Sequence, residues 1–86
     1  MKTFTDLVWA KKVKPSQKLL LLALARRSES TNGVCAITAP ELAAEMCVSL
    51  MTVWKAVREL EAAGLLMVER NDHAAPNVYG LRMGDF

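Results

Sequence analysis

Seven consecutive apolar residues, Leu19–Ala25, lie within one predicted helix and constrain the fold more than any other feature of the chain. Pro15 suits the first turn of that helix, because a proline there gives up no hydrogen bond. Ser28–Gly33 is a run of turn-forming residues, so the helix ends near Arg27. A helix that is apolar on nearly every side must be covered on more than one side. Leu19–Ala25 therefore belongs either to the central helix of the domain or to a helix that also contacts a second subunit.

The size and composition of the chain predict one folded domain over residues 1–86. With 86 residues, there is no room for a second core, and 52% hydrophobic residues suffice for a folded globule. The apolar run is far shorter than the roughly 20 residues that a membrane span requires. No signal peptide opens the sequence, so a cytoplasmic location is expected.

Two cysteines and a few acidic residues are the only candidates for chemistry. Cys35 and Cys47 form no CxxC pair, and only His73 could assist them, so buried, reduced thiols are expected and a metal site is not. Glu59 and Glu61 are two positions apart on a predicted helix and face different ways. No glycine-rich phosphate loop or nucleophile–base arrangement is found in the sequence. The chain is therefore expected to have no cofactor and not to be an enzyme.

Capping signals locate two helices in the middle of the chain. Thr38 and Glu41 form a capping box that opens a helix running to about Met46. Ser49 caps the next helix, which ends just before Gly64, a natural left-handed terminator.

The remaining elements are shorter. Helical spacing of Phe4, Leu7 and Val8 predicts a short helix in an N-terminal extension, residues 1–14. Val34–Ile37 is a short β-prone segment. After the helical core, residues 15–64, two β-prone runs flank the polar loop 71–76 and predict a hairpin over residues 65–82.

The helix that follows Ser49 has three faces when its residues are placed at 100° each. The core face is formed by Val53, Ala56, Val57 and Leu60. The opposite, outer face is formed by Met51, Lys55, Arg58 and Ala62. Leu50 and Trp54 fall between these two faces.

These elements together resemble the winged helix-turn-helix superfamily. The stretch ELAAEMCVSLMTVWKAVRELEAAGLL, residues 41–66, is similar to its bacterial pattern. The matching places are filled by Ala43, Val48, Ser49, Val53, Leu60, Gly64 and Leu65. KPSQKLLLLALARRS resembles the first helix of such domains in phage and plasmid replication proteins and in small transcription regulators. The chain departs from the pattern at Cys47, where glycine is common and the turn requires a left-handed backbone.

The resemblance implies an α+β fold, mainly α with a small β-hairpin: a three-helix core followed by a wing. It implies sequence-specific binding of double-stranded DNA, by a small transcription regulator or by a replication-associated factor. In this fold the second helix of the motif lies in the major groove.

The DNA-contacting residues expected from this resemblance come from three segments. The groove-facing helix contributes Ser49, Met51, Thr52, Lys55 and Arg58, with Trp54 at its edge. The wing contributes Arg70, Asn71 and His73 at the minor groove or the DNA backbone. The net charge of +2 is too small to indicate nucleic acid by itself, but residues 11–27 hold six basic residues and no acidic one. That segment adds Lys14 and Lys18 as phosphate contacts.

A second hypothesis is that the chain is a protein-interaction module that docks through Leu50, Met51 and Trp54. Alternatively, Trp54 packs against the wing or near Phe4 and Trp9, and Lys55 and Arg58 form an ordinary solvated face beside the glutamates at 59 and 61. We favour the DNA-reading helix, because the two basic residues lie opposite the core face. Under that hypothesis, replacing Trp54 with Ala should damage folding more than binding.

A homodimer is the expected oligomeric state, because Leu19–Ala25 offers more apolar surface than a small domain readily covers alone. Light scattering at tens of micromolar should then give the mass of a dimer. A solution that contains monomer alone would contradict this expectation.

Overall fold

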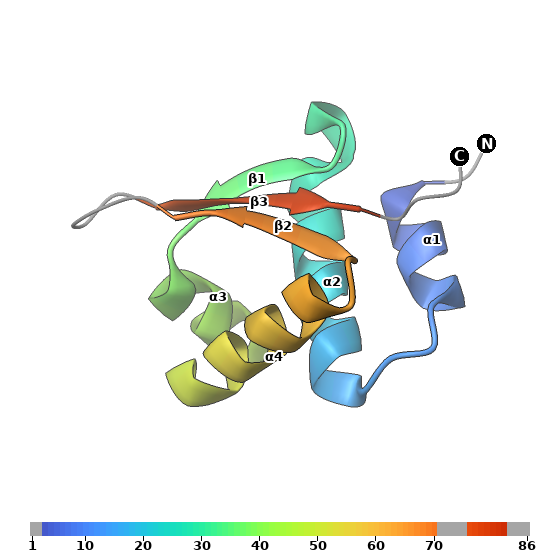
Figure 1. Cartoon of the computed structure of the whole chain (residues 1–86). Coiled ribbons are helices and arrows are strands. Elements are labelled where there is room, and N and C mark those ends of the chain that lie inside the picture. Colours follow the sequence, from blue (N-terminus) through green and yellow to red (C-terminus); the bar gives the residue numbers. More distant parts are fainter. Residues whose placement is uncertain (1–2, 71–75, 83–86) are drawn as a thin grey trace.

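The computed structural model describes residues 3–70 and 76–82, in which a group of helices lies against one face of a small antiparallel sheet (Figure 1). In chain order the elements are α1 (Phe4–Ala10), α2 (Pro15–Ser28), the 3-10 helix η1 (Glu29–Thr31), β1 (Val34–Ile37), α3 (Ala39–Met46), α4 (Leu50–Ala62), β2 (Leu66–Glu69) and β3 (Asn77–Leu81). The predicted α+β class, with a helix-turn-helix followed by a hairpin, is confirmed.

The sheet has three strands in the order β1-β3-β2, so β3 is its central strand. Tyr79 of β3 pairs with Cys35 of β1 on one side and with Val68 of β2 on the other. The hairpin of β2 and β3, called the wing hairpin below, was predicted from its β-prone runs. The pairing of β1 with β3 was not predicted, because it joins segments that are more than forty positions apart.

Helix α2 is the centre of the hydrophobic core, and the chain itself covers it. It packs against α1, α3, α4 and the sheet. Leu20, Leu21 and Leu24 are fully buried, and Leu19 alone in the apolar run is classed as exposed, at 40%. The surface that suggested a dimer is therefore filled within one chain, and the homodimer remains a prediction without that support.

Helix α1 covers α2 because both of its ends are held. At its start, the Glu29 carboxylate accepts a hydrogen bond from the Phe4 amide at 2.7 Å. At its end, the Lys18 ammonium donates to the carbonyl oxygens of Val8 and Trp9, at 3.2 and 2.9 Å. These last carbonyls of a helix have no partner within the helix, so a lysine there satisfies them. The short helix predicted over the N-terminal extension is thus part of the core.

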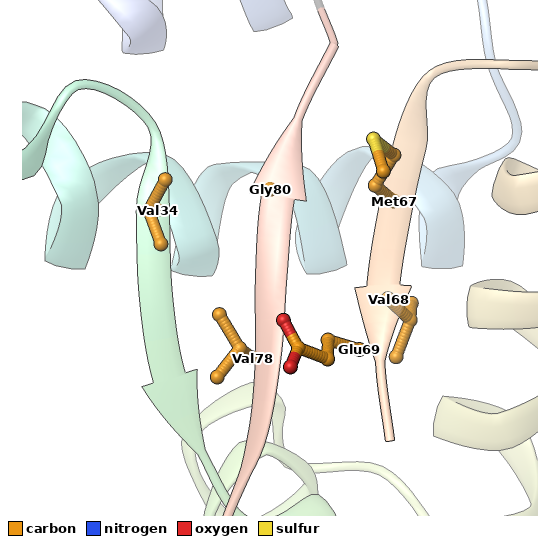
Figure 2. Close-up of a pocket in the computed structure, with 6 residues that line it drawn as sticks. All are labelled: Val34, Met67, Val68, Glu69, Val78 and Gly80. Carbon is orange, nitrogen blue, oxygen red and sulfur yellow. The ribbon is translucent and has the colours of Figure 1, made fainter. Parts of the chain in front are cut away.

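The outward face of the sheet carries mostly apolar side chains (Figure 2). The register places Val34, Gly80 and Met67 in one row across the three strands. Val78 and Glu69 lie in the next row, with α2 behind the sheet in this view. Strand alternation accounts for this arrangement, because the residues between them face the core.

The turn between α3 and α4 contains Cys47 in the left-handed region, with φ of 59° and ψ of 42°. The left-handed conformation expected for Cys47 from its position in the helix-turn-helix pattern is therefore confirmed. The Val48 amide donates back to the Ala43 carbonyl at 3.1 Å, which closes the end of α3. The expectation that both cysteines are buried was wrong for Cys47, which is exposed, and right for Cys35. A left-handed residue at a helix end projects from the turn, so its side chain reaches solvent.

Replacing Cys47 with Gly should raise the free energy of unfolding by about 1 kcal/mol, because glycine adopts positive φ without the steric penalty of a Cβ. Urea denaturation followed by circular dichroism measures the change. The matched control is Asn32→Gly, at the other positive-φ residue that is not glycine among those described. Asparagine tolerates this conformation, so its gain should be smaller. A Cys47→Gly protein no more stable than the parent would show that the turn carries no strain.

Candidate nucleic-acid interface

Helix α4 begins at a hydrogen-bonded cap. The Ser49 hydroxyl accepts from the Thr52 amide at 3.2 Å and lies 2.9 Å from the Thr52 hydroxyl. The cap fixes the direction in which the chain enters α4, directly after the left-handed turn at Cys47. The first turn of α4 contains no acidic residue, so its amide end carries no negative side chain.

The core face predicted for α4 is confirmed. Its four residues, Val53, Ala56, Val57 and Leu60, are buried. Met51, Lys55 and Arg58 are exposed on the other side, as their positions in the helix predicted. Leu50 and Thr52 are half-buried between the two faces. The buried stripe rests on α2 and α3, so it determines which side chains of α4 face solvent.

Glu59 and Glu61, which the alternative of a solvated face placed beside Lys55 and Arg58, make their direct contacts with other residues. The Glu59 carboxylate accepts from Gln17 at 2.9 Å and lies 3.4 Å from the Lys14 ammonium. These contacts, the Gln17 hydrogen bond first, hold the pKa of Glu59 below its ordinary value. Within residues 3–70 and 76–82, neither Lys55 nor Arg58 forms a hydrogen bond or ion pair with a carboxylate. The outer face of α4 is therefore positively charged.

Arg70, at the end of β2, forms a two-pronged ion pair with Glu61 of α4. Its two terminal nitrogens lie 2.7 and 3.1 Å from the two carboxylate oxygens. The hydrogen bonds from Arg70 are the main reason that the pKa of Glu61 is lowered. This pair fastens the wing hairpin to α4 and neutralises Arg70, which sequence analysis had placed on the DNA. Beside it, Trp54, Val57, Arg58 and Arg70 line a hollow of about 200 Å³.

The two lysines predicted as phosphate contacts have partners within the protein. Lys14 pairs with Glu59, although its side chain remains largely exposed. Lys18 holds the end of α1, and its ammonium lies 5.4 Å from the centre of the Trp9 ring. The Lys18 ammonium is directed at α1, and its contact with a DNA phosphate remains a prediction. Its helical position was plain in the sequence, but its partners lie nine and ten positions away.

Trp54 is more exposed than its flank position suggested. The wing hairpin lies beside it through Arg70, yet 52% of the residue remains accessible. The alternative in which Phe4 and Trp9 bury it is not observed, because Phe4 packs against Gly33 and Trp9 lies under Lys18. The four-residue wing strand β2 contacts α4 but leaves much of the indole in solvent.

Sequence analysis also missed a third ion-pair group, between α2 and α3. Glu45 lies 2.6 Å from Arg27 and 3.8 Å from Arg26. Glu45, Glu59 and Glu61 thus pair with four of the eleven Lys and Arg residues of the chain: Lys14, Arg26, Arg27 and Arg70. No signal in the sequence assigns these partners, because each pair joins two separate elements. Asn71 and His73, the other predicted wing contacts, lie outside the described residues.

Other kinds of site are not found in the described part of the chain. Residues 3–70 and 76–82 hold no group of three or more His, Cys, Asp or Glu arranged to bind a metal ion. None of the described helices has the length and apolarity to cross a membrane.

Comparison with known proteins adds one finding. The family model described as a helix-turn-helix domain matches residues 12–66, well over half of the chain. The matched region begins just before α2 and ends at the first residue of β2, so it contains α2, β1, α3 and α4. No curated protein and no solved structure matches significantly.

Replacing Trp54 with Ala should lower the free energy of unfolding by about 1 kcal/mol or less, because half-exposed side chains contribute little to packing. This corrects the expectation that the substitution damages folding. The comparison is Leu60→Ala in the buried stripe of the same helix, which should lower it by roughly 2–5 kcal/mol. Urea denaturation of the two proteins measures both changes. Equal losses would mean that the indole is part of the core.

Proposed function

Because the chain belongs to the helix-turn-helix domain family, we propose that it binds double-stranded DNA sequence-specifically, with α4 in the major groove. Helix-turn-helix domains are DNA-binding domains in which the second helix of the motif reads base edges. Here α3 is the first helix of the motif and α4 is the second. The proposed role is that of a small transcription regulator, of bacterial, phage or plasmid type and cytoplasmic.

The free positive charge on the outer face of α4 is the observation that carries this proposal. Lys55 and Arg58 are exposed, and within residues 3–70 and 76–82 neither forms a direct ion pair with a carboxylate. Glu59 and Glu61 attract them through space only. Lysine and arginine bind phosphate oxygens or the acceptor edge of guanine. The glutamates of α4 make their direct contacts with Lys14, Gln17 and Arg70, which leaves the side chains of Lys55 and Arg58 accessible to DNA.

The groove contacts follow from the position of each residue along α4. In helix-turn-helix domains the N-terminal half of the reading helix lies nearest the bases. Ser49, Met51 and Thr52 occupy that half here, with Trp54 and Lys55 in the middle of the helix. Arg58 lies one turn further along, where a phosphate is within reach.

The wing hairpin has a secondary role in the proposal. Arg70 supports the interface by holding the hairpin against α4, and Asn71 and His73 remain candidates for contact with the DNA backbone or the minor groove. Arg70 can bind a DNA phosphate only if its guanidinium contacts that phosphate and the Glu61 carboxylate at the same time.

The second candidate function is protein docking through Leu50, Met51 and Trp54. The exposure of Met51, at 72%, and of Trp54 favours it, whereas Leu50 is half-buried. Binding measured against salt concentration separates the two functions. DNA affinity falls steeply with salt as counterions are released, and an apolar protein contact shows no such dependence. A replication-associated DNA-binding factor is a further alternative to a transcription regulator.

Replacing Arg58 with Ala should weaken DNA binding by roughly 1–3 kcal/mol if the side chain reaches a base, or lower the salt slope by about one if it holds a phosphate. Fluorescence anisotropy with a duplex enriched by the protein from a random-sequence pool measures both. The matched control is Arg82→Ala, which removes the same charge. Arg82 donates through its amide to the Leu65 carbonyl, beside the end of α4 that is remote from Ser49.

The control should bind DNA as the parent does. If Arg58→Ala left both the affinity and the salt slope unchanged, the outer face of α4 would not be the DNA-binding surface. Loss of a protein partner on replacing Trp54, with DNA affinity unchanged in Arg58→Ala, would support the docking function.

A further inference from the structure

We infer that α4 recognises the 5-methyl groups of pyrimidines in the major groove, through Met51 and Trp54. The inference rests on the proposed function and specifies which DNA it selects. Its starting point is the mixture of side chains on the outer face of α4. Met51 lies in the first turn, nearest the bases, and Trp54 lies beside Lys55 in the middle of the helix. Arg58 lies one turn further along.

Met51 and Trp54 are the most exposed large apolar residues of α4. Met51 lies in the first turn, and Trp54 follows three positions later, which places both on neighbouring turns of one helix surface. Met51 is 72% exposed, more than any other large hydrophobic residue among those described. Neither side chain is buried in the core, so core packing does not explain why these two positions are apolar.

The polar side chains of the same turn are engaged with each other. The Ser49 hydroxyl accepts from the Thr52 amide and forms a second hydrogen bond with the Thr52 hydroxyl. Thr52 is also half-buried. Met51 is 72% exposed, so the first turn of α4 presents a large apolar side chain to solvent beside this pair of hydroxyls. Hydrogen bonds from α4 to bases or phosphates therefore fall mainly to Lys55 and Arg58, and the first turn offers an apolar contact.

The 5-methyl group is the apolar feature that a base presents in the major groove. Thymine carries it, and it distinguishes A·T from T·A pairs as a contact for apolar side chains. 5-Methylcytosine presents the same group at the same ring position. A flexible methionine adapts its shape to such a contact, because its three rotatable bonds and polarizable sulfur fit irregular surfaces. Trp54 adds a flat apolar surface whose indole N–H is a donor for a phosphate.

The charge beside these residues indicates DNA, not a protein, as the occupant. Lys55 follows Met51 by four positions and Arg58 follows Trp54 by four, so each apolar residue has a free cation on the next turn. Lysine is depleted in protein interfaces, whereas arginine is enriched there, so Lys55 is the cation that favours DNA over a protein. On DNA, the phosphates flank the methyl groups of the groove and neutralise both side chains.

The test uses two versions of one duplex. The protein first enriches a duplex from a random-sequence pool, and that duplex is resynthesised with deoxyuridine in place of every thymidine. The substitution removes the methyl groups and keeps the Watson–Crick pairing. The parent protein should bind the deoxyuridine duplex about fourfold more weakly for each methyl group contacted, the ratio that corresponds to exposing one CH₂-sized group.

A third duplex distinguishes the two sources of the methyl group. Replacing the cytosines of the enriched duplex with 5-methylcytosine should leave binding unchanged if thymine is the ligand. Tighter binding of the 5-methylcytosine duplex than of the unmodified one would assign 5-methylcytosine as a ligand as well.

Variants assign the effect to the two side chains. Met51→Ala and Trp54→Ala should each reduce the ratio between the thymidine and deoxyuridine duplexes. Met67→Ala is the matched control, since Met67 is also exposed but lies on the outward face of the sheet (Figure 2). It should keep the full ratio, and circular dichroism verifies that all three variants are folded.

The outcomes separate this inference from the proposed function. Equal binding of the thymidine and deoxyuridine duplexes, with Arg58→Ala still weakened, would overturn methyl recognition and leave DNA binding intact. If Met51→Ala and Trp54→Ala both kept the parent's ratio between binding of the thymidine and deoxyuridine duplexes, the assignment to Met51 and Trp54 would be overturned. Failure of the parent protein to enrich any duplex would overturn the proposed function and this inference together.

Discussion

The burial of α2 is the constraint on which the other elements depend. A helix with leucine or alanine on almost every side must be surrounded, and the chain supplies α1, α3, α4 and the sheet for this purpose. The stripe from Val53 to Leu60 is the contribution of α4 to that cover. Because the stripe is buried there, the opposite face of α4 has to lie in solvent. The candidate interface is thus a consequence of how α2 is covered.

The charge of the candidate interface is likewise decided by what the surrounding acidic residues bind. The net charge of +2 conveys little, since electrostatic attraction at contact distance depends on local charges. Glu45, Glu59 and Glu61 each hold cationic side chains from neighbouring elements. Those ion pairs are exposed, so each contributes little to stability. Their larger effect is that, within residues 3–70 and 76–82, Lys55 and Arg58 remain exposed and outside any direct ion pair.

Local signals in the sequence predicted the elements well. Caps at Thr38 and Ser49 and the left-handed stop at Gly64 work within a few residues, and the structure contains all three. The predictions that failed concern side chains whose surroundings come from distant segments. Cys47 is exposed, and Trp54 is only half covered. Each of these outcomes depends on how far a neighbouring element extends over the residue, which periodicity does not encode.

The sequence by itself determined the helices, the wing hairpin and the division of α4 into a buried and an outer face, because these depend on spacing along the chain. Its resemblance to helix-turn-helix domains also indicated the family, and the family match over residues 12–66 confirms it. Only the tertiary structure decided that β1 joins β3, that one chain covers α2, and that Arg70 is held by Glu61. The physical reason is that hydrogen bonds, ion pairs and apolar contacts between elements form according to distance in space. Residues far apart in the sequence become partners only when the core has brought their elements together.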